Sequence, residues 1–383
     1  MANDKHVPEL TIKIDGSTSI KTDSSSNLET RSGQGILAVT VDLRLDSPDM
    51  FSVQYDMMAL EKLNLIDSFK PGAKVEIGLG LEESGVLCVG EVSYIEPSFD
   101  VDTGYRTTIS GYHKLHRLTR GQRSRTWGDG LEAQAAPTDT VRQVIADSKA
   151  QKGGNSDAMS ADEIGSGDVK HHYIPQLNAS DFEILQALGA DLEYKADSDE
   201  ADKVKFKAPD PAQEPVITLA RERASAGETG LMLNAGFRLS TVQQYARVEV
   251  RSWDPWTKKN IVGVAESSKY KFEGTTGAAA TGKALYGSAA NGRTYIVTDH
   301  PVNTQDEANR MAQALFDQFS MDFVTGEVTI QGNPKAIPGA TLEFTGFGKV
   351  FSGIYMMTSA THSYSPEEGY RTTIGFARNA HGA

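Results

Sequence analysis

The sequence lacks the features that mark several large classes of protein. It has one cysteine, Cys88, among 383 residues, so no intrachain disulfide can form and nothing indicates an oxidising compartment. No run of about 18 apolar residues is present, which excludes a membrane-spanning helix. The first residues are polar and lack the apolar segment of a signal peptide. We therefore expect a protein that stays in the cytoplasm unless a larger particle carries it out.

The sequence also has fewer basic than acidic residues. Asp and Glu number 51 against 38 Lys and Arg, which gives a formal net charge of −13. An acidic surface repels phosphate groups, so we expect no sequence-specific nucleic-acid binding. What the chain does have is 36 glycines, 13 tyrosines and 14 phenylalanines, a composition that favours strands and tight turns. Its length is sufficient for two or three domains.

One short sequence occurs twice. Residues 104–111 read GYRTTISG and residues 369–376 read GYRTTIGF. The similarity continues upstream, where PGAKVEI at 71–77 corresponds to PGATLEF at 338–344. From the proline of one motif to the glycine of the next is 33 residues in the first copy and 31 in the second. We interpret this as one β module used twice in the chain.

Both copies have the period-two pattern of a β-strand. The Tyr-x-Thr-x-Ile positions share one face and the arginine lies on the other, while each Pro-Gly pair is typical of a turn. We expect each copy to be a small, strongly bent β-barrel or sandwich. The residues that define the two copies are Pro71, Gly72, Gly104, Tyr105, Arg106 and Ile109, then Pro338, Gly339, Gly369, Tyr370, Arg371 and Ile374.

Between the two copies the pattern is mixed. It predicts a helix from Thr138 to Ser148 and another from about Ser180 to Leu188, each with a capping residue at its start. Residues 151–169 are polar and rich in glycine and serine, which predicts a mobile loop. The segments LEYKAD and KVKFKAP follow as a predicted strand pair.

The last part of the chain returns to strands. Residues 241–253 alternate like a strand that enters the second module. Thr304 and Glu307 form the signature of a capping box at the start of a helix. The predicted fold is therefore α+β and β-rich, with two related small β-barrel modules that flank an α+β middle section. The predicted boundaries are 1–120, 121–237 and 238–383, with an inserted loop and helix at about 257–322.

The order of these segments resembles the late control protein D family, which comprises the baseplate hubs of contractile phage tails and tailocins. It is also similar to the N-terminal half of VgrG proteins of type VI secretion. The resemblance covers nearly the whole chain and depends on an ordered set of motifs rather than on one signature. These motifs are SGYHKLHRLTRGQRSRTW (110–127), IPQLNASDFEILQALGADLEYKAD (174–197) and GNPKAIPGATLEF with FSGIYMMTSATHSYSPEEGYRTTIGFAR (332–378).

The resemblance implies a structural hub rather than an enzyme. It implies a homotrimer, in which two modules per chain give six near-equivalent positions. Such a hub adapts the six-fold ring of the tail tube protein to a trimeric spike protein, contacts other baseplate proteins and leaves a central channel. The chain ends where VgrG continues into its spike, so we expect the spike to be a separate chain. This favours a phage, tailocin or extracellular injection system over type VI secretion.

We expect no catalytic residue, cofactor or metal, because three motifs that could suggest one are better explained in other ways. Residues 277–283 match G-x-x-x-x-G-K, but Ala284 replaces the Ser or Thr of a phosphate-binding loop. The tripeptide Asp102-Thr103-Gly104 is better interpreted as a turn than as half of an aspartic-protease site. The pairs His113 with His116 and His171 with His172 have no cysteine or carboxylate at ligand spacing.

A cluster of basic residues has two open interpretations. It is a solvated linker face, or it contacts an acidic neighbouring subunit or the spike, because arginine is favoured at interfaces. Trp253 and Trp256 are likewise expected either in the core or at an interface. The alternative to the hub is a monomeric β-rich binding or adhesin module, which would leave the duplication unexplained. The candidate interface residues are Arg117, Arg120, Arg123, Arg125 and Trp127.

Overall fold

The structure is a computed structural model that describes most of the chain. Thr103, Trp256 and residues 278–284, the rest of the G-x-x-x-x-G-K motif with Ala284, lie outside the described part. The described residues are 8–16, 18–22, 35–45, 47–62, 66–80, 85–102, 104–129, 134–150, 159–165, 170–192, 195–198, 203–210, 212–222, 230–254, 257–277, 293–300 and 302–382.

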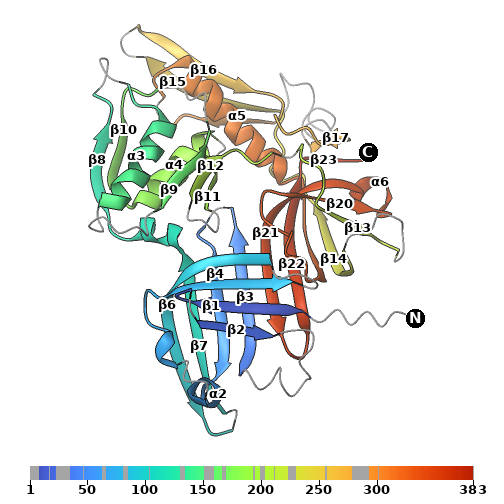
Figure 1. The fold of residues 1–383 in the computed structure, drawn as a ribbon. Coiled ribbons are helices and arrows are strands. Elements are labelled where there is room, and N and C mark those ends of the chain that lie inside the picture. The colour runs from blue at the N-terminus through green and yellow to red at the C-terminus, as the bar shows by residue number, and fades with distance from the viewer. Residues whose placement is uncertain are drawn as a thin grey trace.

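One 13-stranded sheet holds both copies of the repeated sequence (Figure 1). The first module contributes β1 (Glu9–Ile14), β2 (Thr18–Thr22), β3 (Ile36–Arg44), β4 (Met50–Asp56), β5 (Lys74–Gly80), β6 (Gly85–Asp100) and β7 (Gly104–His113). The second contributes β13 (Ile217–Ala220), β14 (Met232–Leu239), β19 (Val324–Gln331), β20 (Thr341–Thr345), β21 (Gly353–Ser365) and β22 (Gly369–Arg378).

The two modules have the same strand order. The first is β3-β4-β7-β6-β5-β1 and the second is β14-β19-β22-β21-β20-β13. They differ at one end, because β1 is antiparallel to β5 whereas β13 is parallel to β20. The α+β, β-rich fold class with an internal duplication is confirmed. Closure into barrels is not found, since no strand pair in the described part of the chain closes either module.

The register of the two copies is also the same. In the first copy Ile109 lies opposite Ile95 and a bulge follows Val92; in the second copy Ile374 lies opposite Ala360 and the bulge follows Met357. The position of each bulge relative to the GYRTTI strand is therefore unchanged. Shared bulges are specific features of a fold, so this agreement supports a common origin of the two modules.

The Pro-Gly turns correspond as well. Gly72 and Gly339 have φ of 85° and 87°, a backbone conformation that glycine adopts readily. The N–H of Gly72 donates to the carbonyl of Val92 at 2.8 Å, and the N–H of Gly339 donates to that of Met357 at 2.8 Å. Each turn thereby fixes its strand against the bulge of the neighbouring strand.

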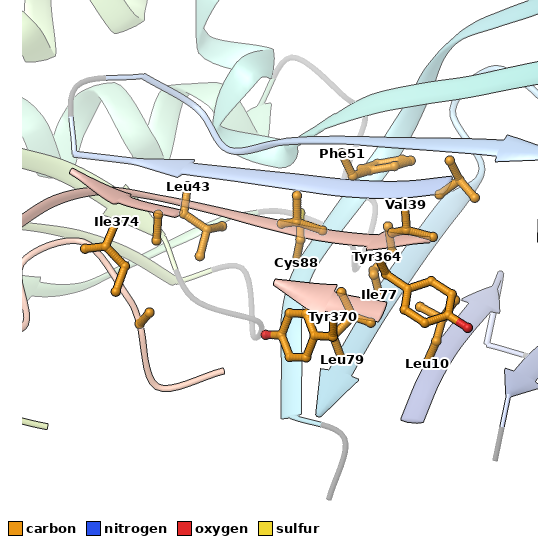
Figure 2. Packing of buried hydrophobic residues seen from close by; sticks show 14 of the residues in the cluster. Leu10, Val39, Leu43, Phe51, Ile77, Leu79, Cys88, Tyr364, Tyr370 and Ile374 are labelled. Atoms are coloured by element: carbon orange, nitrogen blue, oxygen red, sulfur yellow. The ribbon is translucent and has the colours of Figure 1, made fainter. Parts of the chain in front are cut away.

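A single hydrophobic core runs through both modules. It includes Leu10 and Val39 from the first module and Tyr364 and Ile374 from the second (Figure 2). Burying one such side chain stabilises the fold by about 1.5–3 kcal/mol. The modules are thus two halves of one packed unit.

The middle section has its own core, built on α3 (Pro137–Ala150) and α4 (Asp181–Leu192). Both predicted helices are present, and Ser180 with Glu183 caps α4 reciprocally. The predicted loop at 151–169 is wrong in part, because residues 160–164 form a strand that pairs in parallel with residues 203–207. The strands are β8 (Arg123–Trp127), β9 (Ser160–Ile164), β10 (Ile174–Ala179), β11 (Lys195–Ser198) and β12 (Lys203–Lys207).

A third unit covers one end of the second module (Figure 1). Its helix α5 (Gln305–Met321) has the predicted Thr304–Glu307 capping box and packs on a small sheet of β15, β16 and β18. The strand predicted to enter the second module is β15, which lies in this sheet instead because its apolar face packs against α5. The bounds are β15 (Arg247–Asp254), β16 (Lys259–Ala265) and β18 (Thr294–Val297), with β17 (Thr275–Thr276) and β23 (Ala380–His381) nearby.

The predicted domain boundary at residue 237 falls inside β14. Both β13 and β14 pair with strands of the second module, although they precede the third unit in the chain. Short helices complete the description: α2 (Met57–Lys62), η1 (Ile66–Ser68), η2 (Lys114–Thr119) and α6 (Gly348–Phe351). Among the described helices, none is long and apolar enough to cross a membrane.

Candidate assembly site

The repeated GYRTTI strands occupy matching places but differ in exposure. Ile109 and Ile374 are buried, as the alternation predicts. Tyr370 is 3% exposed, whereas Tyr105, its counterpart, is 48% exposed. The outward Arg371 forms an ion pair with Glu368 at 3.2 Å. The sequence pattern thus gave the correct face for these positions but not how far each face is covered.

The cause of the difference is a joint between the modules. On the edge of β21 that faces away from β22, residues 359–364 pair with β3 of the first module. Thr361 lies opposite Asp42, and its hydroxyl donates to Oδ1 of Asp42 at 2.8 Å. On the other face of the sheet, Ala360 and Leu43 lie opposite each other and are buried. We call this β3–β21 pairing the joint.

A buried histidine lies on the second-module strand of the joint. His362 is fully buried, with Nε2 3.0 Å from the carbonyl oxygen of Ala336 and Nδ1 2.8 Å from the hydroxyl of Tyr370. A carbonyl only accepts, so Nε2 carries the proton and Nδ1 accepts from Tyr370. Burial lowers the pKa of His362 to about 4, which keeps the ring neutral. The group is therefore a structural part of the core.

The matching edge of the first module has no second strand beside it among the described residues. Residues 94–100 of β6 pair with β7 on one side, and no other described strand pairs with them. Several side chains here are apolar and exposed, and Phe99 packs edge-on against Tyr105 with ring centroids 5.6 Å apart. Contiguous exposed apolar residues mark interaction surfaces. The exposed residues of this patch are Tyr94, Ile95, Phe99, Val101 and Tyr105, which are 38–95% exposed.

Most of the predicted basic interface is engaged within the chain. Arg125 of β8 contacts Asp147 of α3 at 2.6 Å and Asp181 of α4 at 2.7 Å, and its guanidinium lies 4.6 Å from the centre of the Trp127 ring. Arg123 also reaches Asp181, at 3.2 Å. The structure thus brings these three predicted residues together as a clamp that holds β8 to both helices.

The other two arginines lie apart from this clamp. Arg117 pairs with Glu91 of β6, and both side chains are largely buried. Arg120 is exposed in the turn after η2. Nothing in these contacts tests whether the basic residues meet a second chain, so their interface role stays a prediction. What sequence reasoning missed is that the carboxylate partners come from elements up to 58 residues away.

The three chemical motifs have ordinary structural surroundings where they are described. His113 accepts a hydrogen bond from the N–H of Leu115 at 3.2 Å, and His116 stacks on Tyr112. His171 pairs with Glu307 at 2.9 Å. In the described ranges, no three His, Cys, Asp or Glu side chains are grouped to hold a metal ion. Asp102 lies in the turn between β6 and β7, and the G-x-x-x-x-G-K segment lies outside the described residues beyond Gly277.

The comparison with protein families gives one match. The family described as the Alg8 N-terminal domain matches residues 62–366, which is most of the chain. The chain belongs to that family. The description of the Alg8 N-terminal domain names no activity and no assembly, so it does not confirm the late control protein D resemblance. No curated protein matches the chain.

Two solved structures similar to this Alg8 N-terminal domain member are tail proteins. The 43 kDa tail protein of prophage MuSo2 from Shewanella oneidensis has a TM-score of 0.66 and 13% identity, and the match covers 97% of this chain and 98% of that one. The tail protein of Neisseria meningitidis MC58 has a TM-score of 0.66 and 10% identity, with 97% of each chain covered. This chain therefore has the fold of these proteins over nearly its entire length.

A third similar structure comes from a secretion system. The E. coli c3393 protein is a component of the type VI secretion system with structural similarity to T4 bacteriophage tail proteins gp27 and gp5. It has a TM-score of 0.56 and 11% identity, and the match covers 95% of this chain and 76% of that one. The shared fold extends across the two modules and the sections between them.

Proposed function

We propose that the chain is the structural hub of the baseplate in a phage-like contractile tail or injection machine. In this proposal three copies form a ring with a central channel. The ring receives the six-fold tail tube protein on one side and a trimeric spike protein on the other, within a particle assembled in the cytoplasm. The fold shared with two tail proteins along their whole length supports a tail role.

The observation that carries the proposal is the duplication. Two modules with the same strand order and register lie side by side in one chain. Three chains then present six near-equivalent modules, which is what a six-fold tube requires of a protein that is chemically three-fold. The middle section occurs once per chain, so it keeps three-fold symmetry and suits a trimeric spike.

We propose a structural role without catalysis. The polar groups of the joint, His362 and Thr361, are bonded to neighbours in the sheet, and His362 is fully buried. The clamp arginines are likewise bonded to carboxylates of the same section. These arrangements stabilise the fold, and a force-bearing hub needs stability more than it needs a reactive group.

One observation favours a second candidate. The exposed aromatic pair Phe99 and Tyr105 resembles a surface on which a sugar ring or another flat ligand stacks. A monomeric binding or adhesin module would use this patch directly. The two candidates differ in self-association, because the hub requires it and the adhesin does not.

The test is the native mass of the purified chain at micromolar concentration, measured by light scattering and native mass spectrometry. The hub predicts a species of about 124 kDa, three chains of 41.4 kDa. A chain that stays at 41.4 kDa even with tube and spike proteins present would overturn the hub and favour the binding module.

A further inference from the structure

Each module has one long strand edge that no other described strand pairs with. One is residues 94–99 of β6, and the other is the side of β14 that faces away from β19. β14 ends the sheet, with β19 as its partner in the described part of the chain. A bare strand edge presents unpaired N–H and C=O groups and is a ready template for another strand.

The duplication indicates which two strands would pair in a second joint. β6 is the counterpart of β21, because both pair with a GYRTTI strand in the same register. β14 is the counterpart of β3, because each pairs with the strand that flanks the GYRTTI strand, β19 or β4. Each also has a bulge at the same place, between Met232 and Asn234 in β14 and between Ile36 and Ala38 in β3. The bare edges are therefore the counterparts of the two strands that form the joint.

We propose that β14 of one copy pairs with residues 94–99 of β6 in a second copy and repeats the joint between chains. This inference rests on the proposed function in that it names the contact that builds the ring. Transferring the joint register sets Ile95 opposite Leu239, Glu96 opposite Arg238 and Phe99 opposite Ala235 of the partner.

The side chains on both edges agree with this register. Glu96 takes the place of Thr361 and Arg238 takes the place of Asp42, so the hydrogen bond of the joint becomes a pair of opposite charges. Directly opposite charges on neighbouring strands attract each other. A shift by one residue would instead set Glu96 beside an apolar residue, Phe237 or Leu239, on the core face.

The exposed apolar groups gain cover in the same way. Ile95 is 38% exposed and Leu239 is 38% exposed, whereas their counterparts in the joint, Ala360 and Leu43, are 0% and 4% exposed. Pro97 has no N–H, so the new ladder is interrupted at one place at most. A proline in an edge strand also discourages pairing with unrelated strands.

The contact is head to tail, since it joins different edges of the two copies. Contacts of this kind close into rings when the rotation between copies allows it. Because the same joint already relates the two modules inside one chain, each module of the ring would have equivalent neighbours on both sides. The occupant of both bare edges is thus a second copy of this chain.

The experiment is a cysteine cross-link in the full-length chain. The double variant Glu96→Cys with Arg238→Cys places two thiols opposite each other across the contact, within the Cα separation that a disulfide accepts. The control Asp42→Cys with Thr361→Cys sets two thiols at the same places in the internal joint, where they cross-link without a change of mass. The native Cys88 is buried and does not compete.

Under mild oxidation the Glu96→Cys, Arg238→Cys chain is expected to give a ladder of cross-linked dimers and trimers on a denaturing gel, and either single variant to give none. If the control closes and the parent is oligomeric but no ladder forms, the strand contact is wrong while the hub stands. A parent chain that stays monomeric with tube and spike proteins present overturns both.

A charge exchange gives a second, independent measurement. Arg238→Glu alone and Glu96→Arg alone are each expected to weaken association at least about tenfold, because each sets like charges opposite each other. The combined variant restores the pair and is expected to return to within about threefold of the parent. Equal weakening in the combined variant would contradict the register.

Discussion

Phe99 in the first module and Tyr364 in the second hold the same place in the fold, yet one is 65% exposed and the other 4%. Each lies opposite the tyrosine of a GYRTTI strand, Phe99 facing Tyr105 and Tyr364 facing Tyr370. The difference is the strand β3, which covers Tyr364 and has no counterpart beside Phe99 in the described chain. A single chain therefore contains one completed joint and the parts of another.

The shared core face can be tested by placing a charge in it. Ile109→Asp and Ile374→Asp each put a carboxylate at a buried position without a partner. We expect each variant to lower the free energy of unfolding by on the order of 3–5 kcal/mol. Urea unfolding followed by circular dichroism gives this value, and the exposed Arg106→Asp serves as control. Unchanged stability of both isoleucine variants would mean that the strands face the other way.

The Pro-Gly turns make a matched pair for measuring backbone strain. Gly72→Ala has no atom near its new Cβ, so its cost comes from the positive φ alone. We expect both Gly72→Ala and Gly339→Ala to cost about 1–2 kcal/mol. Gly85→Ala is the control, because that glycine does not have a positive φ and has room for a methyl group. If Gly85→Ala lowers the stability as much as the two turn variants do, backbone strain is not the cause of their loss.

The buried His362 predicts a pH dependence with a definite sign. Its pKa in the folded chain is about 4, below the ordinary 6.5, because burial disfavours the charged ring. Between pH 6.5 and 4 the unfolded chain binds a proton that the folded chain does not, so stability falls as pH falls. The loss amounts to roughly 3 kcal/mol at its limit and is absent above pH 7.

His362→Gln removes this titration and keeps a polar side chain in place. We expect the variant to be less stable than the parent at pH 7 and the difference to shrink steadily towards pH 4, as measured by urea unfolding at each pH. Parallel stability curves for the two proteins would show that His362 titrates normally in the folded chain.

The arginine clamp separates the two interpretations of the basic cluster. Arg125→Ala leaves Asp181, which is 5% exposed, with a weakened set of partners. We expect a loss of about 2–3 kcal/mol in stability with the native mass unchanged. Arg142→Ala, which removes an exposed pair on one helix, is the control and should cost at most about 0.5 kcal/mol. Loss of association without loss of stability would instead favour the interface interpretation.

The duplication could be predicted from the sequence because six identical residues and the Pro-Gly turns survive in both copies. The capped helices could be predicted for a similar reason, since Thr304 and Glu307 lie within one turn of each other. Signals of this kind are local. They indicate whether a segment is a helix or a strand and which of its faces is buried. Ile109 and Ile374 are both buried, as these signals predict.

Pairings between distant segments could not be predicted. β13 belongs to the second module only because Ile217 lies beside Leu342, and no local pattern connects the two. The strand at 160–164 likewise depends on a partner at 203–207 and has a polar sequence of its own. The exposure of the Phe99 patch could not be predicted from the sequence. Alternation of apolar and polar residues shows which face of a strand a side chain lies on, but not whether another strand covers that face.

The most direct test of the hub is electron cryo-microscopy of the assembled chain, viewed along its axis. The account predicts a three-fold ring in which six β modules surround a central channel, with one middle section per chain on one side. A two-fold dimer, an open filament or separate single chains would contradict it.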